Sequence, residues 1–337
     1  MTQVLRRALP SVDADQLAVA ALRFLAADAV RSSASGAPGS PLGAAPMAWA
    51  LWSRHLRHDP ADPGWADRDR FVLSAEHGPA LLRGLLHLFG YDLSSTAHRA
   101  PAPRERGHPS EPGRGLATAV GMALAERMTR ARCPEVTDHR TYAILGACQP
   151  EESGSRSAAL AARLGLGRLT VLWADDGTGL DGAEQLARFA DRGWHVLAVP
   201  DGTDVDAIDR ALSRAADAPQ PSFVAVRAAA DEDGDRHHLP SVPEQVRELC
   251  EALRHIGRAE HAVWRAEFDA FRKSFPERAA AFERARARGL PAGLADRLGA
   301  RAHDHMPAPT DPGPVPHPRA PVLNRTRLRH LMFRCAR

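Results

Sequence analysis

The chain has 337 residues, of which 44% are hydrophobic, and its formal net charge is +3. This length suits one large α/β domain with an appendage, or two modest domains. The sequence shows no apolar run long enough to span a bilayer and no signal peptide pattern. The basic excess is too small and too dispersed to indicate a nucleic-acid partner. The four cysteines form no CxxC pair, which argues against a zinc site or a disulfide scaffold and favours the reducing cytoplasm.

The first elements that the sequence predicts are mainly helical. Apolar residues recur at helical spacing over about 13–31 and again over about 43–58, and the Gly- and Pro-containing segment Ser35–Pro41 separates these two runs. Residues 71–74 form a short buried strand, and a helix with proline in its first turn follows over 79–89.

Four further short, mostly apolar runs predict strands that are buried on both faces. These strands cover residues 142–145, 169–173, 195–199 and 223–226, and helical segments over 116–129, 155–164, 183–192 and 204–216 alternate with them. The alternation predicts an α/β fold with a doubly wound, mostly parallel sheet and helices on both faces. Ligands of such sheets bind outside the carboxyl ends of the strands. The predicted ends are Ser74, Gly146, Asp175–Asp176 and Pro200–Asp201.

The pattern changes after Val226. Two helical runs over about 242–256 and 259–287 follow a polar loop, and the chain is then rich in proline and alanine from 291 to 321. The last residues are basic with apolar side chains between the arginines, so the tail could dock on a partner chain, contact an acidic surface or be disordered. We therefore divide the chain into a domain over 1–290 and a linker with a basic tail over 291–337.

Several segments, in the correct order, carry a resemblance to a known family. They include Ser35–Gly43, Trp65–Gly78 (WADRDRFVLSAEHG), Leu86–Asp92, Gly107–Pro109, Ala119–Glu126 and Leu164–Leu169. Over roughly residues 16–291 the chain resembles the N-terminal, diphosphate-binding half of transketolase. The block from Trp65 to Gly78 is the most specific of these matches.

The resemblance implies a thiamine diphosphate-binding fold, in which Mg²⁺ holds the diphosphate at the strand ends. In that family the metal takes an Asp from a Gly-Asp-Gly turn and an Asn about one βα unit later, and hard cations prefer such oxygen ligands. A Glu on the pyrimidine-binding half, which this chain does not include, activates the thiazolium ring. The resemblance therefore implies a separate pyrimidine-domain chain as partner, in a hetero-oligomer or dimer, and a sugar phosphate or small carbonyl compound as substrate.

The chain departs from the family pattern at the expected metal site. The Gly-Asp-Gly turn reads Gly146-Ala147-Cys148, so the first metal ligand is missing, and the family Asn aligns with Asp176. Asp176 could compensate for the lost carboxylate and bind the metal, with Asp175 contributing. The alternative is that Asp176 belongs to a solvated acidic turn that follows a strand.

For other candidate site residues, a role in the site and an ordinary packing or surface role both remain open. His77 and His108 match family histidines that face the substrate or the diphosphate, which makes them candidate catalytic residues, or else they are inherited packing residues. Arg114 could bind phosphate directly in place of the metal, or it is an ordinary surface arginine. Glu152 matches the Glu that follows the Gly-Asp-Gly turn. The predicted cofactor-binding residues are Gly146, Asp176, Arg114, Gly115 and Glu152, with Asp176 as the metal ligand.

Two classes of function remain open from the sequence. In the first, the chain is the diphosphate-binding subunit of a split, divergent transketolase, inactive alone, that transfers a two-carbon ketol or acyl unit with its partner. In the second, the chain is a non-catalytic scaffold or regulatory partner that no longer binds thiamine diphosphate. The two differ in whether a phosphate-sized site persists beside Ala147.

Overall fold

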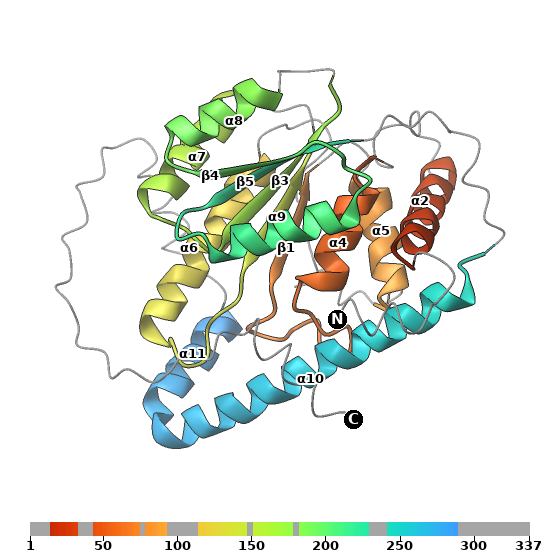
Figure 1. The fold of residues 1–337 in the computed structure, drawn as a ribbon. Helices are drawn as coiled ribbons and strands as arrows, with labels where there is room; N and C mark the ends of the chain where they lie inside the picture. Colours follow the sequence, from red (N-terminus) through yellow and green to blue (C-terminus); the bar gives the residue numbers. More distant parts are fainter. Residues whose placement is uncertain are drawn as a thin grey trace. The chain divides into compact units, whose positions relative to one another are not determined.

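The computed structural model describes residues 14–32, 43–74, 78–92, 114–146, 151–177, 182–228 and 241–288. The chain divides into two compact units, one from Leu5 to Ala270 and the other comprising Met1–Val4 and Phe271–Arg337. The described elements (Figure 1) are α2 (Ala14–Ser32), α4 (Ala45–Arg54), β1 (Arg70–Ser74), α5 (Gly78–Leu88), α6 (Arg114–Arg132), β2 (Thr141–Leu145), α7 (Glu151–Arg163), β3 (Leu169–Asp175), α8 (Gly182–Asp191), β4 (His195–Val199), α9 (Val205–Asp217), β5 (Ser222–Arg227), α10 (Glu244–Ser274) and α11 (Pro276–Arg288).

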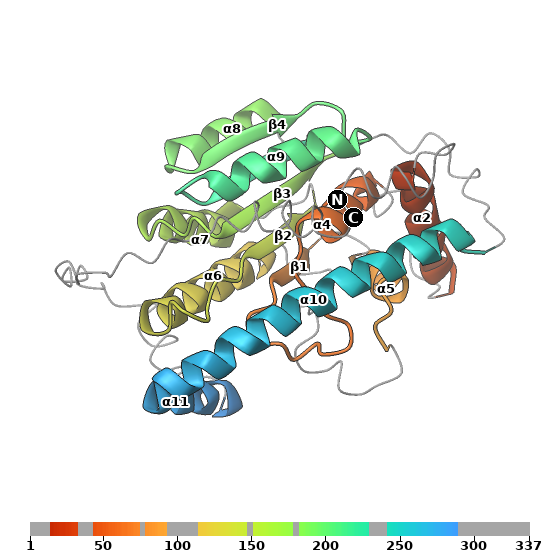
Figure 2. The same cartoon turned by 60° about the horizontal axis from the view of Figure 1, so that its bottom comes forward.

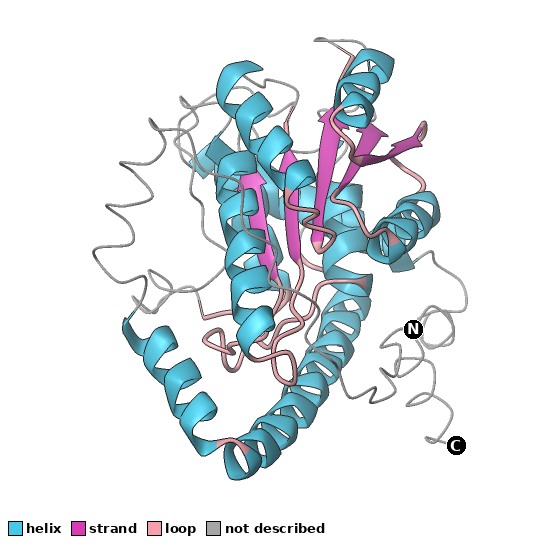
Figure 3. Ribbon diagram, turned by 90° about the vertical axis from the view of Figure 1, so that its left-hand side faces the viewer, coloured by secondary structure: helices cyan, strands magenta, loops and turns pink. Residues whose placement is uncertain are grey.

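The larger unit is built on a five-stranded sheet with the order β1-β2-β3-β5-β4. Every neighbouring pair of strands is parallel, and Figure 3 shows the strand arrows pointing the same way. The strand β5 lies between β3 and β4, so the direction of winding reverses once. The predicted parallel α/β sheet is confirmed, and each strand lies at its predicted place. Short apolar strands suit this position because helices cover both faces of such a sheet.

The helices α6, α7 and α8 cover one face of the sheet. Alternate strand residues point to this face, as the period of a strand requires. They are Val72, Ala143, Leu145, Val171, Trp173, Phe223 and Ala225. The ring of Phe189 in α8 stacks on Phe223 with 3.8 Å between centroids. The indole N–H of Trp194 donates to the carbonyl of Ala158 in α7 at 2.9 Å.

The helices α4 and α9 lie on the opposite face, with α2 and α5 beside α4 (Figures 1 and 2). Trp52 of α4 packs edge-on against Phe71 of β1 with 5.4 Å between ring centroids. Arg54 at the end of α4 is 5% exposed and pairs with Asp206 and Asp209 of α9 and with Asp15 of α2. One guanidinium therefore joins three helices that are distant in the sequence.

The helix α10 corrects one prediction. The sequence suggested a break between two helices near Gly257, but α10 continues through this residue to Ser274. A Cβ at Gly257 would lie 2.1 Å from the carbonyl oxygen of His58, so the glycine allows the helix to approach a loop closely. The helix instead ends before Pro276, because proline lacks an N–H and fits the first turn of the next helix.

The described part of the smaller unit contains the last turn of α10 and α11. The guanidinium of Arg278 lies 5.2 Å from the ring centroid of Phe271 and 4.9 Å from that of Phe275. Arg272 pairs with Glu283 at 3.0 Å. The predicted linker and tail over 291–337 lie outside the described residues. None of the helices in the described ranges is both long and apolar enough to cross a bilayer.

Candidate cofactor-binding site

The carboxyl ends of the parallel strands meet along one edge of the sheet. Ser74 at the end of β1 pairs in register with Leu145 of β2, which pairs with Trp173 of β3. The residue that follows β2, Gly146, donates its N–H to the carbonyl of Ser74 at 3.0 Å. The predicted cofactor-binding residue Gly146 therefore lies at the edge where ligands of such sheets bind.

The predicted residue Gly115 lies at the same edge, in the first turn of α6. A Cβ at this position would lie 2.2 Å from the Cβ of Ser74 and 3.2 Å from the Cδ2 of Leu145. Only glycine therefore lets the first turn of α6 pack directly on the ends of β1 and β2. The unpaired amides of such a turn favour anions, so this contact places them beside Gly146.

The two acidic residues after β3 have different surroundings. Asp175 is 8% exposed, and its carboxylate accepts the Gly177 N–H at 3.0 Å and pairs with Arg227 of β5 at 3.0 Å. Asp176 is exposed. The expectation that Asp175 contributes to a metal site does not fit this geometry, because Arg227 and the turn occupy its carboxylate. Asp176 keeps the position that the sequence predicted for a ligand.

Several predicted site residues fall where no side chain is described. His77, His108 and Ala147 lie outside the described residues. Arg114 and Glu152 lie on α6 and α7, but the structure does not describe their side chains. The structure thus places Gly115 and Gly146 at the edge where β3 ends just before Asp176, and the binding roles of all the predicted site residues remain predictions.

The profile of one protein family, described as the transketolase thiamine diphosphate binding domain, matches residues 14–235. The chain belongs to this transketolase domain family. It is 38% identical over 323 residues to transketolase 2 of Xanthobacter flavus, covering 79% of this chain and 46% of that protein. It is 40% identical over 333 residues to the plasmid-encoded transketolase of Cupriavidus necator, covering 81% of this chain and 49% of that protein.

Solved transketolase structures share the fold. A variant of Pichia stipitis transketolase superposes with a TM-score of 0.73 and 28% identity, covering 85% of this chain and 50% of that one. The complex of the same enzyme with sedoheptulose 7-phosphate gives a TM-score of 0.72 and 28% identity, covering 84% and 50%. The chain thus spans about half the length of the curated relatives it matches.

The described transketolase-like edge fits a diphosphate held through Mg²⁺, with few protein ligands. Mg²⁺ is commonly bound by one or two carboxylates together with phosphate oxygens. Asp176 offers one exposed carboxylate, and the first turn of α6 offers amides for an anion. The described residues contain no group of three or more His, Cys, Asp or Glu that could hold a metal ion.

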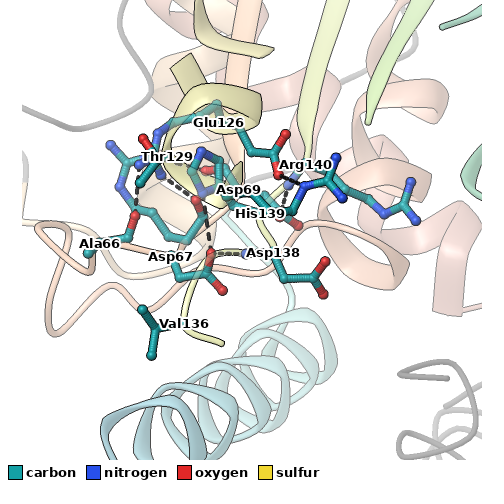
Figure 4. Close-up of polar contacts among 12 residues, drawn as sticks. Ala66, Asp67, Asp69, Glu126, Thr129, Val136, Asp138, His139 and Arg140 are labelled. Atoms are coloured by element: carbon teal, nitrogen blue, oxygen red, sulfur yellow. Dashed lines mark hydrogen bonds and ion pairs between the residues drawn. The ribbon is translucent and has the colours of Figure 1, made fainter. Parts of the chain in front are cut away.

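The specific block from Trp65 to Gly78 contributes a buried polar network at the amino end of the sheet (Figure 4). The carboxylate of Asp69 accepts the backbone N–H groups of Arg57 at 2.8 Å and Arg140 at 2.7 Å. Arg140 precedes β2, and Asp69 precedes β1. One buried carboxylate therefore joins the starts of two strands that are far apart in the chain.

Asp67 has a similar role and is 1% exposed. Its carboxylate accepts the Asp138 N–H at 2.6 Å, His139 Nδ1 at 3.2 Å and Arg57 Nη2 at 2.9 Å. Burial acts to raise the pKa of Asp67, but the His139 hydrogen bond and the Arg57 charge outweigh it and lower the pKa to about 2. Burial lowers the pKa of His139 to about 4, against the hydrogen bond with Asp67. The ring of His139 is therefore neutral at neutral pH and donates to an ionised carboxylate.

Two structural roles were not predicted from the sequence. The Trp65–Gly78 block is specific to the family, but its two described aspartates fix the amino ends of β1 and β2, at the opposite end of the sheet from the candidate site. The partner of Asp175, Arg227, was also missed. No local pattern marks it, because it meets Asp175 only through the register of β3 and β5.

Proposed function

We propose that this chain is the diphosphate-binding subunit of a two-chain transketolase with an altered metal–diphosphate site. Membership of the family and coverage of about half of the relatives support this proposal. The observation that carries it is the close packing at the sheet edge, where Gly115 in the first turn of α6 packs on Ser74 beside Gly146. This contact brings the first turn of α6 to the edge where ligands of such sheets bind.

The roles of the residues follow from their positions. The first turn of α6 and Gly146 would hold the diphosphate, and Asp176 would bind Mg²⁺ in place of the acid that is absent at Ala147. Arg114 and Glu152 are proposed to line the same site, and His77 and His108 to contact the substrate. When bound, the cofactor supplies the carbanion equivalent that carries a two-carbon unit. The chain itself supplies the position and the electrostatics.

The partner and the substrate class follow from the family. A second polypeptide with the pyrimidine-binding half would complete the site and supply the activating Glu, so the isolated chain is inactive. The Pichia stipitis enzyme is known in complex with sedoheptulose 7-phosphate, which supports a sugar phosphate as substrate. Within this chain, we assign the diphosphate-binding role to residues 1–290 and a linker or docking role to residues 291–337, in a cytoplasmic hetero-oligomer.

Binding of thiamine diphosphate to the assembled complex tests the proposal. The chain is co-expressed with a pyrimidine-domain chain from the same genome, and melting is followed with and without thiamine diphosphate and Mg²⁺. A ligand at 100 times its dissociation constant stabilises the native state by about 2.7 kcal/mol. We expect the ligand to raise the melting temperature of the complex by an amount that corresponds to this stabilisation, and to leave the melting temperature of the isolated chain unchanged. A complex that forms but shows no shift would leave the non-catalytic scaffold as the function.

An exchange of ligands tests whether Asp176 replaces the missing acid. Ala147→Asp alone adds a second carboxylate and is expected to weaken binding of the anionic diphosphate. Asp176→Asn alone removes the proposed metal ligand and should also weaken it. The double variant restores the family pattern and should recover binding. Strengthened binding by Ala147→Asp alone would show instead that the site had decayed and that Asp176 does not compensate.

A further inference from the structure

The turn that carries Asp176 is fixed by one ion pair between neighbouring strands. Asp175 and Arg227 are register partners on β3 and β5, so their side chains point to the same face of the sheet. Arg227 Nη1 lies 3.0 Å from Asp175 Oδ2. The backbone pairs there as well, since the carbonyl of Asp175 accepts the Ala228 N–H at 2.8 Å.

The guanidinium of Arg227 also packs against the turn itself. Gly177 has a φ of +74°, a conformation that other residues rarely adopt. A Cβ at Gly177 would lie 2.6 Å from Arg227 Nη2. The Gly177 N–H donates to the other oxygen of Asp175. The turn from Asp175 to Gly177 is therefore closed by a hydrogen bond on one side and covered by an arginine on the other.

The start of α8 encloses the same carboxylate. A Cβ at Gly182 would lie 2.8 Å from Asp175 Oδ2, so the first residue of α8 packs directly on this oxygen. A carboxylate at the N-terminus of a helix is stabilised by the helix dipole. Asp175 thus has its two oxygens committed to Gly177, Arg227 and α8, whereas its neighbour Asp176 is exposed.

We propose that Arg227 is a positioning residue for the candidate site, which withholds Asp175 from the ligand and fixes the turn that presents Asp176. The inference rests on the proposed function for its consequence in ligand binding. With Arg227 in place, the carboxylate of Asp175 is held in an ion pair within the turn, and the exposed residue Asp176 follows it at the sheet edge. Without Arg227, Asp175 would lose its ion pair, and the turn that carries Asp176 would lose the side chain that packs against Gly177.

Variants of the pair test the proposal in two measurements. Arg227→Gln should speed hydrogen exchange of the backbone around Gly177 in the free chain, and should weaken thiamine diphosphate–Mg²⁺ binding to the assembled complex by about 10–100-fold, as outer partners of metal ligands commonly do. Arg227→Lys keeps the charge and should lose less. The double variant of Asp175→Asn and Arg227→Gln should lose no more than the single variants, because both remove the same interaction.

A matched surface arginine provides the control. Arg210 is 68% exposed and lies 3.6 Å from Asp204, so Arg210→Gln should leave exchange around Gly177 and cofactor affinity unchanged. If Arg227→Gln leaves the exchange at wild-type rates, the positioning role is wrong. If the wild-type complex does not bind the cofactor, the proposed function fails, while the exchange measurement still decides whether Arg227 fixes the turn. Wild-type binding with undiminished affinity in Arg227→Gln would overturn the inference alone.

Discussion

Acidification tests the buried network at the amino end of the sheet. His139 is held neutral because burial lowers its pKa from 6.5 to about 4. The unfolded chain therefore takes up a proton below about pH 6.5, while the native chain resists it until about pH 4. Stability from this residue is complete above pH 6.5 and is lost as the pH falls towards 4. Replacing His139 with Asn removes the titrating ring and keeps a neutral hydrogen-bond donor.

The size of the effect follows from the depressed pKa. Each unit of pKa difference between the unfolded and native states is worth about 1.4 kcal/mol. The shift of His139 therefore predicts a loss of about 3 kcal/mol between pH 6.5 and 4. Asp67 contributes in a lower window, because its pKa of about 2 lies below the ordinary 3.8. Its stabilisation is present above pH 3.8 and is lost as the pH falls towards 2, so measurements down to pH 4.5 separate the contribution of His139 from that of Asp67.

The assay is urea unfolding, followed by tryptophan fluorescence, at intervals from pH 7 to pH 4.5. The free energy of unfolding of the wild-type chain should fall steadily over this range. His139→Asn should be less stable at pH 7, because it leaves space in a buried site, but its stability should change less with pH. His87→Asn, at an exposed position on α5, should keep the wild-type slope. Equal slopes for the wild type and His139→Asn would refute the account of a buried neutral histidine.

Four further substitutions test the packing. Gly115→Ala should destabilise the chain by about 1–3 kcal/mol through overpacking on the strand ends, measured by urea unfolding. Gly121→Ala on the same helix meets nothing within 4 Å and should be neutral or stabilising by up to about 1 kcal/mol. Gly257→Ala should destabilise through its clash with His58, and an unchanged melting temperature would contradict the close approach of α10. Arg54→Met should cost about 1–3 kcal/mol by removing bonds to three carboxylates, measured by urea unfolding.

Much of the sheet was predictable from local patterns. The strands over 142–145, 169–173, 195–199 and 223–226 are short apolar runs, and β2, β3, β4 and β5 occupy these places. Burial on both faces leaves such a run few alternatives to a parallel strand. The expected burial is wrong for β4, which lies at the edge of the sheet and exposes Ala198. Family membership was also predictable, because it depends only on the order of residue types, whereas the loss of a metal-binding acid at Ala147 stays a prediction.

The helix breaks were less predictable. The predicted helical runs over about 242–256 and 259–287 left a break around Gly257, but this residue lies inside α10, where a loop carbonyl packs against it. Propensity is a local quantity, whereas the close approach depends on a residue about 200 positions earlier in the chain.

The sequence by itself determined the parallel α/β fold, the family and the position of the candidate site at the strand ends. Only the tertiary structure decided that Asp175 is bound to Arg227 while Asp176 is exposed, and that Asp67 joins two strand starts. These contacts link residues 52 and 71 positions apart. Contacts over such separations depend on strand order and register, and neither can be predicted from the residues on one side of the contact alone.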